Sequence, residues 1–342
     1  MGTDISIALT MFTVFAPAGA IAFFLLALCI LPRDAHLGQT KRLNRWLILP
    51  LAVCMTGLVA SATHLGTPSN ALYVLSGWGR SPLSNEVVSA LAFLLAAGLY
   101  WLSAFSDRIP VLASKVWLAL ASLTALWLVA MISIVYAIPT ILTWNSPYIP
   151  PIMWLTAFVS GPLLAIATIV FAERTDLGPA HEGLGDVKEP GRAGEGAGLA
   201  AAGARAAADG GRGGAGGGCT AADGGRAAAG GTREDSLGPL GVMLAISLLS
   251  LVAGAVLLAL QYKELGSLEN ALGAALGLAP WYGAVLAAFV ALAAAGIAVV
   301  ATPLFKRRLP RRRTATLGVL CAFLGIAAVR VGFYSLHMTI GL

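Results

Sequence analysis

Charged side chains are scarce in this chain of 342 residues. Asp, Glu, Lys and Arg together make up 11% of it, whereas a soluble domain carries about 25% of such residues. This scarcity excludes a soluble globular protein. Hydrophobic residues make up 58% of the chain, and its mean hydropathy is +0.83. We therefore expect an integral membrane protein.

Cysteine and histidine are also few, with four residues of each. The cysteines are Cys29, Cys54, Cys219 and Cys321, and no two of them form a CxxC pair. Because iron–sulfur clusters need clustered thiolates and an isolated buried cysteine usually behaves as a small hydrophobe, we expect no iron–sulfur cluster and no metal site in this chain. His36 and His181 fall in predicted loops, which excludes a protein with two haems.

Long apolar runs dominate what remains. A helix needs about 20 apolar residues to cross about 30 Å of hydrocarbon, and continuous runs of this length favour helices over the alternating strands of a barrel. Only Asp4 precedes the first run, which is too long for a secretory signal. We predict an all-α integral membrane protein, an eight-transmembrane-helix bundle. The predicted spans are 7–31, 46–64, 86–106, 113–137, 152–172, 238–261, 281–303 and 315–337.

Basic residues predict the orientation of these helices. Nearly all of the 22 Lys and Arg residues fall in alternate loops, while the opposite loops hold only Arg80 and Lys263. Cytoplasmic loops retain basic residues, so we expect both termini to face outward, away from the cytoplasm. The run "KRRLPRRR" (306–313) lies between two predicted helices. Such a run fixes topology and meets anionic lipid headgroups, and we expect no nucleic-acid partner.

A glycine- and alanine-rich segment interrupts the apolar pattern at residues 173–236. Glycine at this density cannot recover its backbone entropy through burial, so we predict a flexible cytoplasmic linker without helices. The chain then divides into five transmembrane helices (1–172), the linker (173–236) and three transmembrane helices (237–342).

Ionisable and aromatic residues gather where several helices should end on the outer side of the membrane. His64 closes the second span, Glu86 opens the third, and Arg330, Tyr334 and His337 share one face of the last. Each also has a simpler interpretation. His64 suits a helix C-terminus, and Glu86 suits a first turn capped by Ser84 or Asn85. Tyr334 suits an interfacial aromatic belt, together with Trp78, Trp144, Tyr148, Trp281 and Tyr282.

Quinol oxidation is the chemistry that would use these groups together. A lipid-soluble dihydroxy ring must lose two protons and two electrons. Histidine can accept a hydroxyl proton near neutral pH, so we expect His64 to accept it and Glu86 to relay it. Arg330 or Tyr334 would hold the second ring oxygen, and His337 would complete the site. Arg330 is costly inside a helix unless it is paired, and we expect it to have a partner.

Six short motifs carry a family resemblance. They occur in this order: "HLGTP" (64–68), "LSNE" (83–86), "TWNSP" (143–147), "GPLL" (161–164), "ELG" after Gln261, and "FYSLHMTIG" (333–341). In these motifs the sequence resembles the membrane-anchor subunit of the anaerobic dimethyl sulfoxide reductase family (DmsC type). The glycine- and alanine-rich insertion departs from that pattern.

The resemblance implies an eight-helix anchor that oxidises menaquinol and contains no haem. It also implies two partners, a four-cluster iron–sulfur subunit and a molybdopterin catalytic subunit that faces the periplasm. The family's menaquinol-binding histidine corresponds to His64, and its associated carboxylate corresponds to Glu86.

Two alternatives stay open. One is a haem b quinol oxidoreductase anchor in which His64 and His337 ligate one iron axially. The other is a purely structural membrane anchor, which would have the same topology and the same outer docking surface. A transporter is disfavoured, because the centres of the predicted helices hold almost no charge.

Overall fold

The computed structural model describes residues 3–33, 38–63, 71–106, 109–137, 139–175, 224–270 and 273–337. The protein divides into one unit of Met1–Thr175 with Leu237–Leu342, and a second unit of Asp176–Ser236. The described residues belong to the first unit, apart from the beginning of one helix. The helices are α1 (Thr3–Ile30), α2 (Gly38–Trp46), α3 (Ile48–Thr63), α4 (Ala71–Ser76), α5 (Pro82–Ser103), α6 (Val111–Val135), α7 (Ile149–Arg174), α8 (Gly224–Leu265), α9 (Tyr282–Phe305) and α10 (Arg312–Ser335).

Eight helical spans in the described part of the protein are long and apolar enough to cross a membrane. They begin and end within a few residues of the predicted spans, with one exception. The second span extends back to Gly38, because the polar helix α2 precedes α3. Leu47 separates the two helices. The proline ring of Pro50 would clash with the carbonyl of residue 46 in a continuous helix, which explains the break.

Helix α8 begins inside the segment predicted to be a helix-free linker. It starts at Gly224 rather than near residue 238. Alanine is the strongest helix former, and adding residues to an existing helix costs far less than nucleating a new one. Residues 224–236 therefore continue the membrane helix, with three alanines favouring the extension and four glycines opposing it, which corrects the prediction for this stretch.

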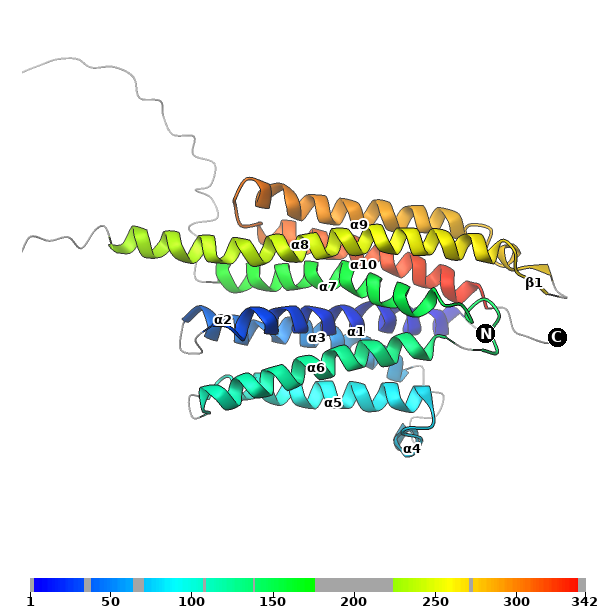
Figure 1. Cartoon of the computed structure of the whole chain (residues 1–342), viewed down its shortest axis with the longest axis horizontal. Helices are drawn as coiled ribbons and strands as arrows, with labels where there is room; N and C mark the ends of the chain where they lie inside the picture. Colours follow the sequence, from blue (N-terminus) through cyan, green and yellow to red (C-terminus); the bar gives the residue numbers. More distant parts are fainter. Residues whose placement is uncertain are drawn as a thin grey trace, which may run out of the picture. The chain divides into compact units, whose positions relative to one another are not determined.

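Helices α1 and α7 form the centre of the first unit, and both are largely buried. Helix α1 contacts α3, α6, α7 and α10, while α9 packs on α10 and α5 on α6 (Figure 1). Small residues permit the closest approaches. A Cβ atom at Gly19 of α1 would lie 2.7 Å from the backbone nitrogen of Cys54 in α3. Close backbone packing of this kind is how membrane helices associate.

Beyond α8, a two-stranded antiparallel hairpin connects to α9. Strands β1 (Glu269–Asn270) and β2 (Gly273–Ala274) pair Glu269 with Ala274, and a 3-10 turn (Ala275–Gly277) follows them.

The helices alternate in direction, so N-termini of some helices and C-termini of others lie together at one end of the bundle. Helices α1, α5, α7 and α9 begin at this end, and α3, α6, α8 and α10 finish there (Figure 1). We call it the rim. The predicted site residues that the structure describes, Glu86, Arg330, Tyr334 and His337, lie near helix ends at the rim.

Candidate functional site

Glu86 is a buried residue of α5 and does not cap the helix. The helix begins earlier than predicted, with Ser81 as N-cap and Pro82 at the first position, which proline favours. Glu86 therefore lies in the second turn. Asn85 does not cap the helix either, since its Oδ1 accepts a hydrogen bond from the Gly79 backbone nitrogen at 2.7 Å. The interpretation of Glu86 as a first-turn carboxylate behind a capping residue is therefore wrong.

The Glu86 carboxylate lies in an incompletely satisfied environment. Its side chain is 4% exposed, and Oε2 has no hydrogen-bond partner in the described part of the protein. The carboxylate interacts electrostatically with Tyr136 and Tyr334. A buried polar atom without a partner costs free energy, so its retention here points to a role beyond packing.

Two tyrosines connect α6 and α10 beside Glu86. Tyr136 follows the end of α6, and Tyr334 lies in the last turn of α10, with ring centroids 5.8 Å apart. Their hydroxyls hydrogen bond to each other, and the Tyr334 hydroxyl lies 3.1 Å from Thr13 Oγ1 of α1. Burial, with Tyr334 and Glu86 nearby, raises the pKa of Tyr136 well above its usual range. Tyr136 therefore keeps its proton at neutral pH and remains a hydrogen-bond donor.

Arg330 is the most deeply buried charged residue of the site, at 2% exposure. Its Nη2 donates to Thr156 Oγ1 of α7 at 2.6 Å, and its charge faces the hydroxyls of Tyr334, Tyr136 and Tyr282. No carboxylate among the described residues forms an ion pair with it. The expected partner is therefore a set of hydroxyl groups, and the positive charge is not neutralised within the described part.

His337 lies at the surface, next to the site and off the predicted helix face. Helix α10 ends at Ser335, because Leu336 serves as its C-cap and the Thr143 hydroxyl binds the Leu336 carbonyl. His337 is exposed, and its ring meets the Trp144 ring edge-on at 5.3 Å. The prediction that it shares a helical face with Arg330 and Tyr334 is wrong, because the helix terminates first.

Trp144 lies in the loop between α6 and α7 and packs against the end of α10. Its ring stacks on Phe333 at 4.8 Å, and its Nε1 donates to the Phe333 carbonyl at 3.2 Å. Trp144, Tyr282 and Tyr334 are buried, so they do not belong to an interfacial belt, whereas Trp78 and Trp281 are exposed.

Two further polar residues at the rim were not predicted to belong to the site. Gln261 of α8 and Tyr282 of α9 are each 1% exposed, and the Tyr282 hydroxyl donates to Gln261 Oε1 at 3.5 Å. Tyr282 also interacts with Arg330. Their only signal in the sequence is a polar residue at the end of an apolar run, and Tyr282 was assigned to the belt for that reason.

These buried polar side chains interact electrostatically or by hydrogen bonds, and we call the group the polar row. It contains residues from α5, α6, α8, α9 and α10 at the rim. Its members are Glu86, Tyr136, Tyr334, Arg330, Tyr282 and Gln261. The structure thus brings together three predicted site residues, Glu86, Arg330 and Tyr334. His64 follows α3 but lies outside the described residues.

Such a row can supply hydrogen bonds and proton transfer to an oxygen-bearing ring. The tyrosines and Arg330 are donors, and the Glu86 carboxyl group accepts a proton when it is ionised and donates one when it is protonated. Among the described residues, no three His, Cys, Asp or Glu side chains gather as a set of metal ligands.

Comparisons with known proteins identify the family. The family model described as DMSO reductase anchor subunit (DmsC) matches residues 1–180. The sequence is 29% identical to the YnfH subunit of anaerobic dimethyl sulfoxide reductase from Escherichia coli, over 87% of this protein and 81% of the relative. It is 26% identical to the C subunit of the enzyme from the same organism, over 98% of this protein and 96% of that subunit. The C subunit from Haemophilus influenzae is 30% identical over 47% of this protein and 58% of its own length.

These matches confirm the resemblance predicted from the short motifs. The family model covers more than half of the sequence, and eight helices are long and apolar enough to span a membrane. The chain therefore belongs to the DMSO reductase anchor subunit (DmsC) family and is a multi-pass membrane protein.

Proposed function

We propose that this membrane anchor of a DMSO reductase complex oxidises menaquinol at the rim and passes the electrons to an iron–sulfur partner subunit. The observation that carries the proposal is the buried Glu86 carboxylate. Its Oε2 lacks a partner among the described residues, and it lies beside two tyrosines that lead to Arg330.

The residues divide the chemistry between them. Menaquinol loses two protons and two electrons as its two hydroxyls become carbonyls. His64 accepts the two hydroxyl protons one after the other, and Glu86 relays each of them toward water. Arg330 and Tyr334 donate hydrogen bonds to the second ring oxygen, and that interaction strengthens as negative charge develops on the oxygen. His337, next to Trp144 at the surface, borders the outer side of the site.

The electrons leave one at a time to clusters of the partner subunit. We expect this partner to be the four-cluster iron–sulfur subunit, which passes the electrons to a molybdopterin catalytic subunit. The anchor itself would contribute no haem and no cluster. It contributes the bound quinol, the proton acceptors and the surface on which the partner docks.

The rim is proposed to face the periplasm of a bacterial inner membrane, with both termini on that side. Basic residues support this orientation. Lys41, Arg42 and Arg45 occur in α2, and the run 306–313 joins α9 to α10, all at the end opposite the rim. Protons from the quinol would then be released outside.

The test is Glu86→Gln in the assembled complex, because this change keeps the shape of the side chain and removes its basicity. A positioned base contributes about 10²- to 10⁴-fold, so we expect quinol-driven dimethyl sulfoxide reduction to fall about 100-fold. Reduction driven by a viologen donor, which delivers electrons directly to the other subunits, should not change.

Glu269→Gln is the matched control, since Glu269 is an exposed carboxylate near the same rim. It should retain full quinol-driven activity. Equal activity of wild type and Glu86→Gln would contradict the proposal and leave a structural anchor. An absorption band of reduced haem b in the purified complex would favour the haem anchor instead.

A further inference from the structure

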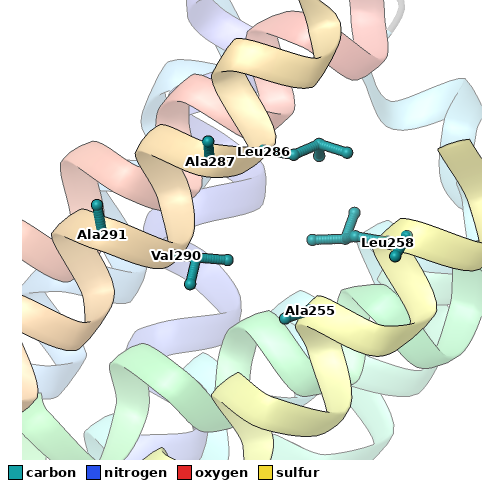
Figure 2. A pocket seen from close by; sticks show the side chains of 7 residues that line it. Ala255, Leu258, Leu286, Ala287, Val290 and Ala291 are labelled. Atoms are coloured by element: carbon teal, nitrogen blue, oxygen red, sulfur yellow. The ribbon is translucent and has the colours of Figure 1, made fainter.

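An apolar groove lies between α8 and α9, away from Glu86. Its volume is about 430 Å³, which falls in the range of about 300 to 1,000 Å³ typical of small-molecule sites. Figure 2 shows Leu258 and Leu286 projecting into the gap from opposite helices. The lining residues are Ala255, Leu258, Ala259, Leu286, Ala287, Val290 and Ala291.

The shape of the groove suits a flat apolar group. Four of its seven lining residues are alanines, two on each helix. Short side chains on facing helices leave a slot between the backbones, and Leu258 and Val290 border it with apolar surface. The groove offers no polar lining group that would hold a phosphate or a sugar.

A second, smaller cavity adjoins the groove at Leu258, which lines both. Its volume is about 10 Å³, enough for about one water-sized group. Gln261, Tyr282 and Arg330 contribute its polar lining. An oxygen atom attached to a ring in the groove could occupy this cavity, but a phosphate group could not.

Two buried donors at the small cavity lack acceptors. Arg330 Nε and Gln261 Nε2 have no hydrogen-bond partner among the residues that the structure describes. Their side chains are 2% and 1% exposed. Buried donors are normally satisfied, and an exception calls for an explanation. The explanation that fits this position is an acceptor oxygen supplied by a ligand.

We propose that the α8–α9 groove binds an isoprenoid quinone in its oxidised form, at a site separate from Glu86. The flat ring lies in the alanine-lined slot, and one ring carbonyl accepts hydrogen bonds from Arg330 Nε and Gln261 Nε2. The apolar tail continues toward the lipid. The oxidised form is preferred because both free groups are donors, and a carbonyl accepts two hydrogen bonds without needing an acceptor in return.

This site shares Arg330 with the proposed quinol site but includes none of the other residues assigned to that site. Gln261, Tyr282 and Arg330 are the members of the polar row that line the small cavity, and Glu86, Tyr136 and Tyr334 line neither cavity. The groove could therefore hold a quinone while the Glu86 site is empty or inactive.

The experiment is photolabelling of the assembled complex with a naphthoquinone that carries a diazirine on its isoprenoid tail. Cross-linked peptides are identified by mass spectrometry. We expect labelling of α8 and α9 that excess menaquinone competes away and excess phosphatidylcholine does not. Menaquinone should compete better than menaquinol.

Three variants complete the test. Ala287→Trp fills the slot and should reduce labelling about tenfold or more, because an overfilled cavity excludes its ligand. The matched control is Ala288→Trp, an exposed neighbour that does not line the groove, and it should label normally. Gln261→Leu removes one donor and should weaken competition by menaquinone about fivefold.

Two results would overturn the proposal. Equal competition by phosphatidylcholine and menaquinone would make the groove a general lipid contact. Unchanged labelling in Ala287→Trp would show that the probe does not bind in the slot. Loss of groove labelling in Glu86→Gln would show that the two sites are one. Normal groove labelling together with unchanged quinol oxidation in Glu86→Gln would instead contradict only the proposed function.

Discussion

Arg330 carries a buried positive charge inside a membrane protein, and this burial needs an explanation. Its guanidinium is satisfied in part by Thr156 and faces three tyrosines, with no carboxylate of the described residues paired to it. Taking a cation out of water costs several kcal/mol, and neutral hydroxyls return only part of that. Such a residue is expensive for stability, which is typical of a functional group inside a membrane.

Arg330→Met tests this balance, because methionine fills a similar apolar volume without the charge. We expect the melting temperature of the complex to stay the same or to rise, since the cost of burying the cation disappears. Quinol oxidation should fall about tenfold or more, which corresponds to the loss of a hydrogen bond from a charged donor. The measurements are a thermal unfolding curve and the KM and kcat for menaquinol. A large fall in melting temperature with unchanged kinetics would make Arg330 a structural residue.

The sequence could predict at which end of the bundle the site residues lie, but not which side chains surround them. Alternating helix directions bring Glu86, Arg330 and Tyr334 to one end, where all three interact electrostatically with Tyr136. Which face of a helix is buried depends on packing with distant segments, so Tyr282 and Gln261 could not be distinguished from interfacial residues. The end of α10 depends on a contact from Thr143, and for that reason the position of His337 was predicted wrongly.

Helix boundaries were predicted well because hydrophobic length sets them, and the exceptions have local causes. Pro50 divides the second span into α2 and α3, and α8 extends back to Gly224 because adding residues to an existing helix costs little. What the sequence could not predict is which helices touch. That depends on small residues at particular positions, such as Gly296 of α9, where an added Cβ would lie 2.6 Å from the Gly318 carbonyl oxygen of α10.

Gly296→Leu should therefore separate α9 from α10 and destabilise the bundle. Overfilling a packed contact costs about 1 to 3 kcal/mol, and this contact involves backbone, which cannot move aside cheaply. We expect a lower melting temperature in detergent, followed by loss of monodisperse protein on size-exclusion chromatography. The matched control is Gly98→Leu in α5, where an added Cβ meets nothing within 4 Å. A loss of stability in Gly98→Leu as large as in Gly296→Leu would refute the close-packing explanation.

The two ends of the bundle differ in charge as well as in their polar interior. At the end opposite the rim, Arg174 donates to the carbonyls of Pro310 and Leu309, and the Arg312 guanidinium lies 5.6 Å from the centre of the Phe171 ring. These contacts hold basic side chains where anionic lipid headgroups of a cytoplasmic leaflet would meet them. The polar row lies at the other end, so the proposed quinol chemistry and the proposed orientation depend on each other.

Cysteine accessibility measures that orientation directly. In a variant without the four native cysteines, Ser267→Cys places a thiol at the exposed rim, and Arg308→Cys places one at the exposed opposite end. Cytoplasmic loops retain basic residues, so a membrane-impermeant maleimide should label Ser267→Cys in intact spheroplasts. It should label Arg308→Cys only after permeabilisation. The reverse pattern would place the polar row on the cytoplasmic side, and quinol protons would then be released inside the cell.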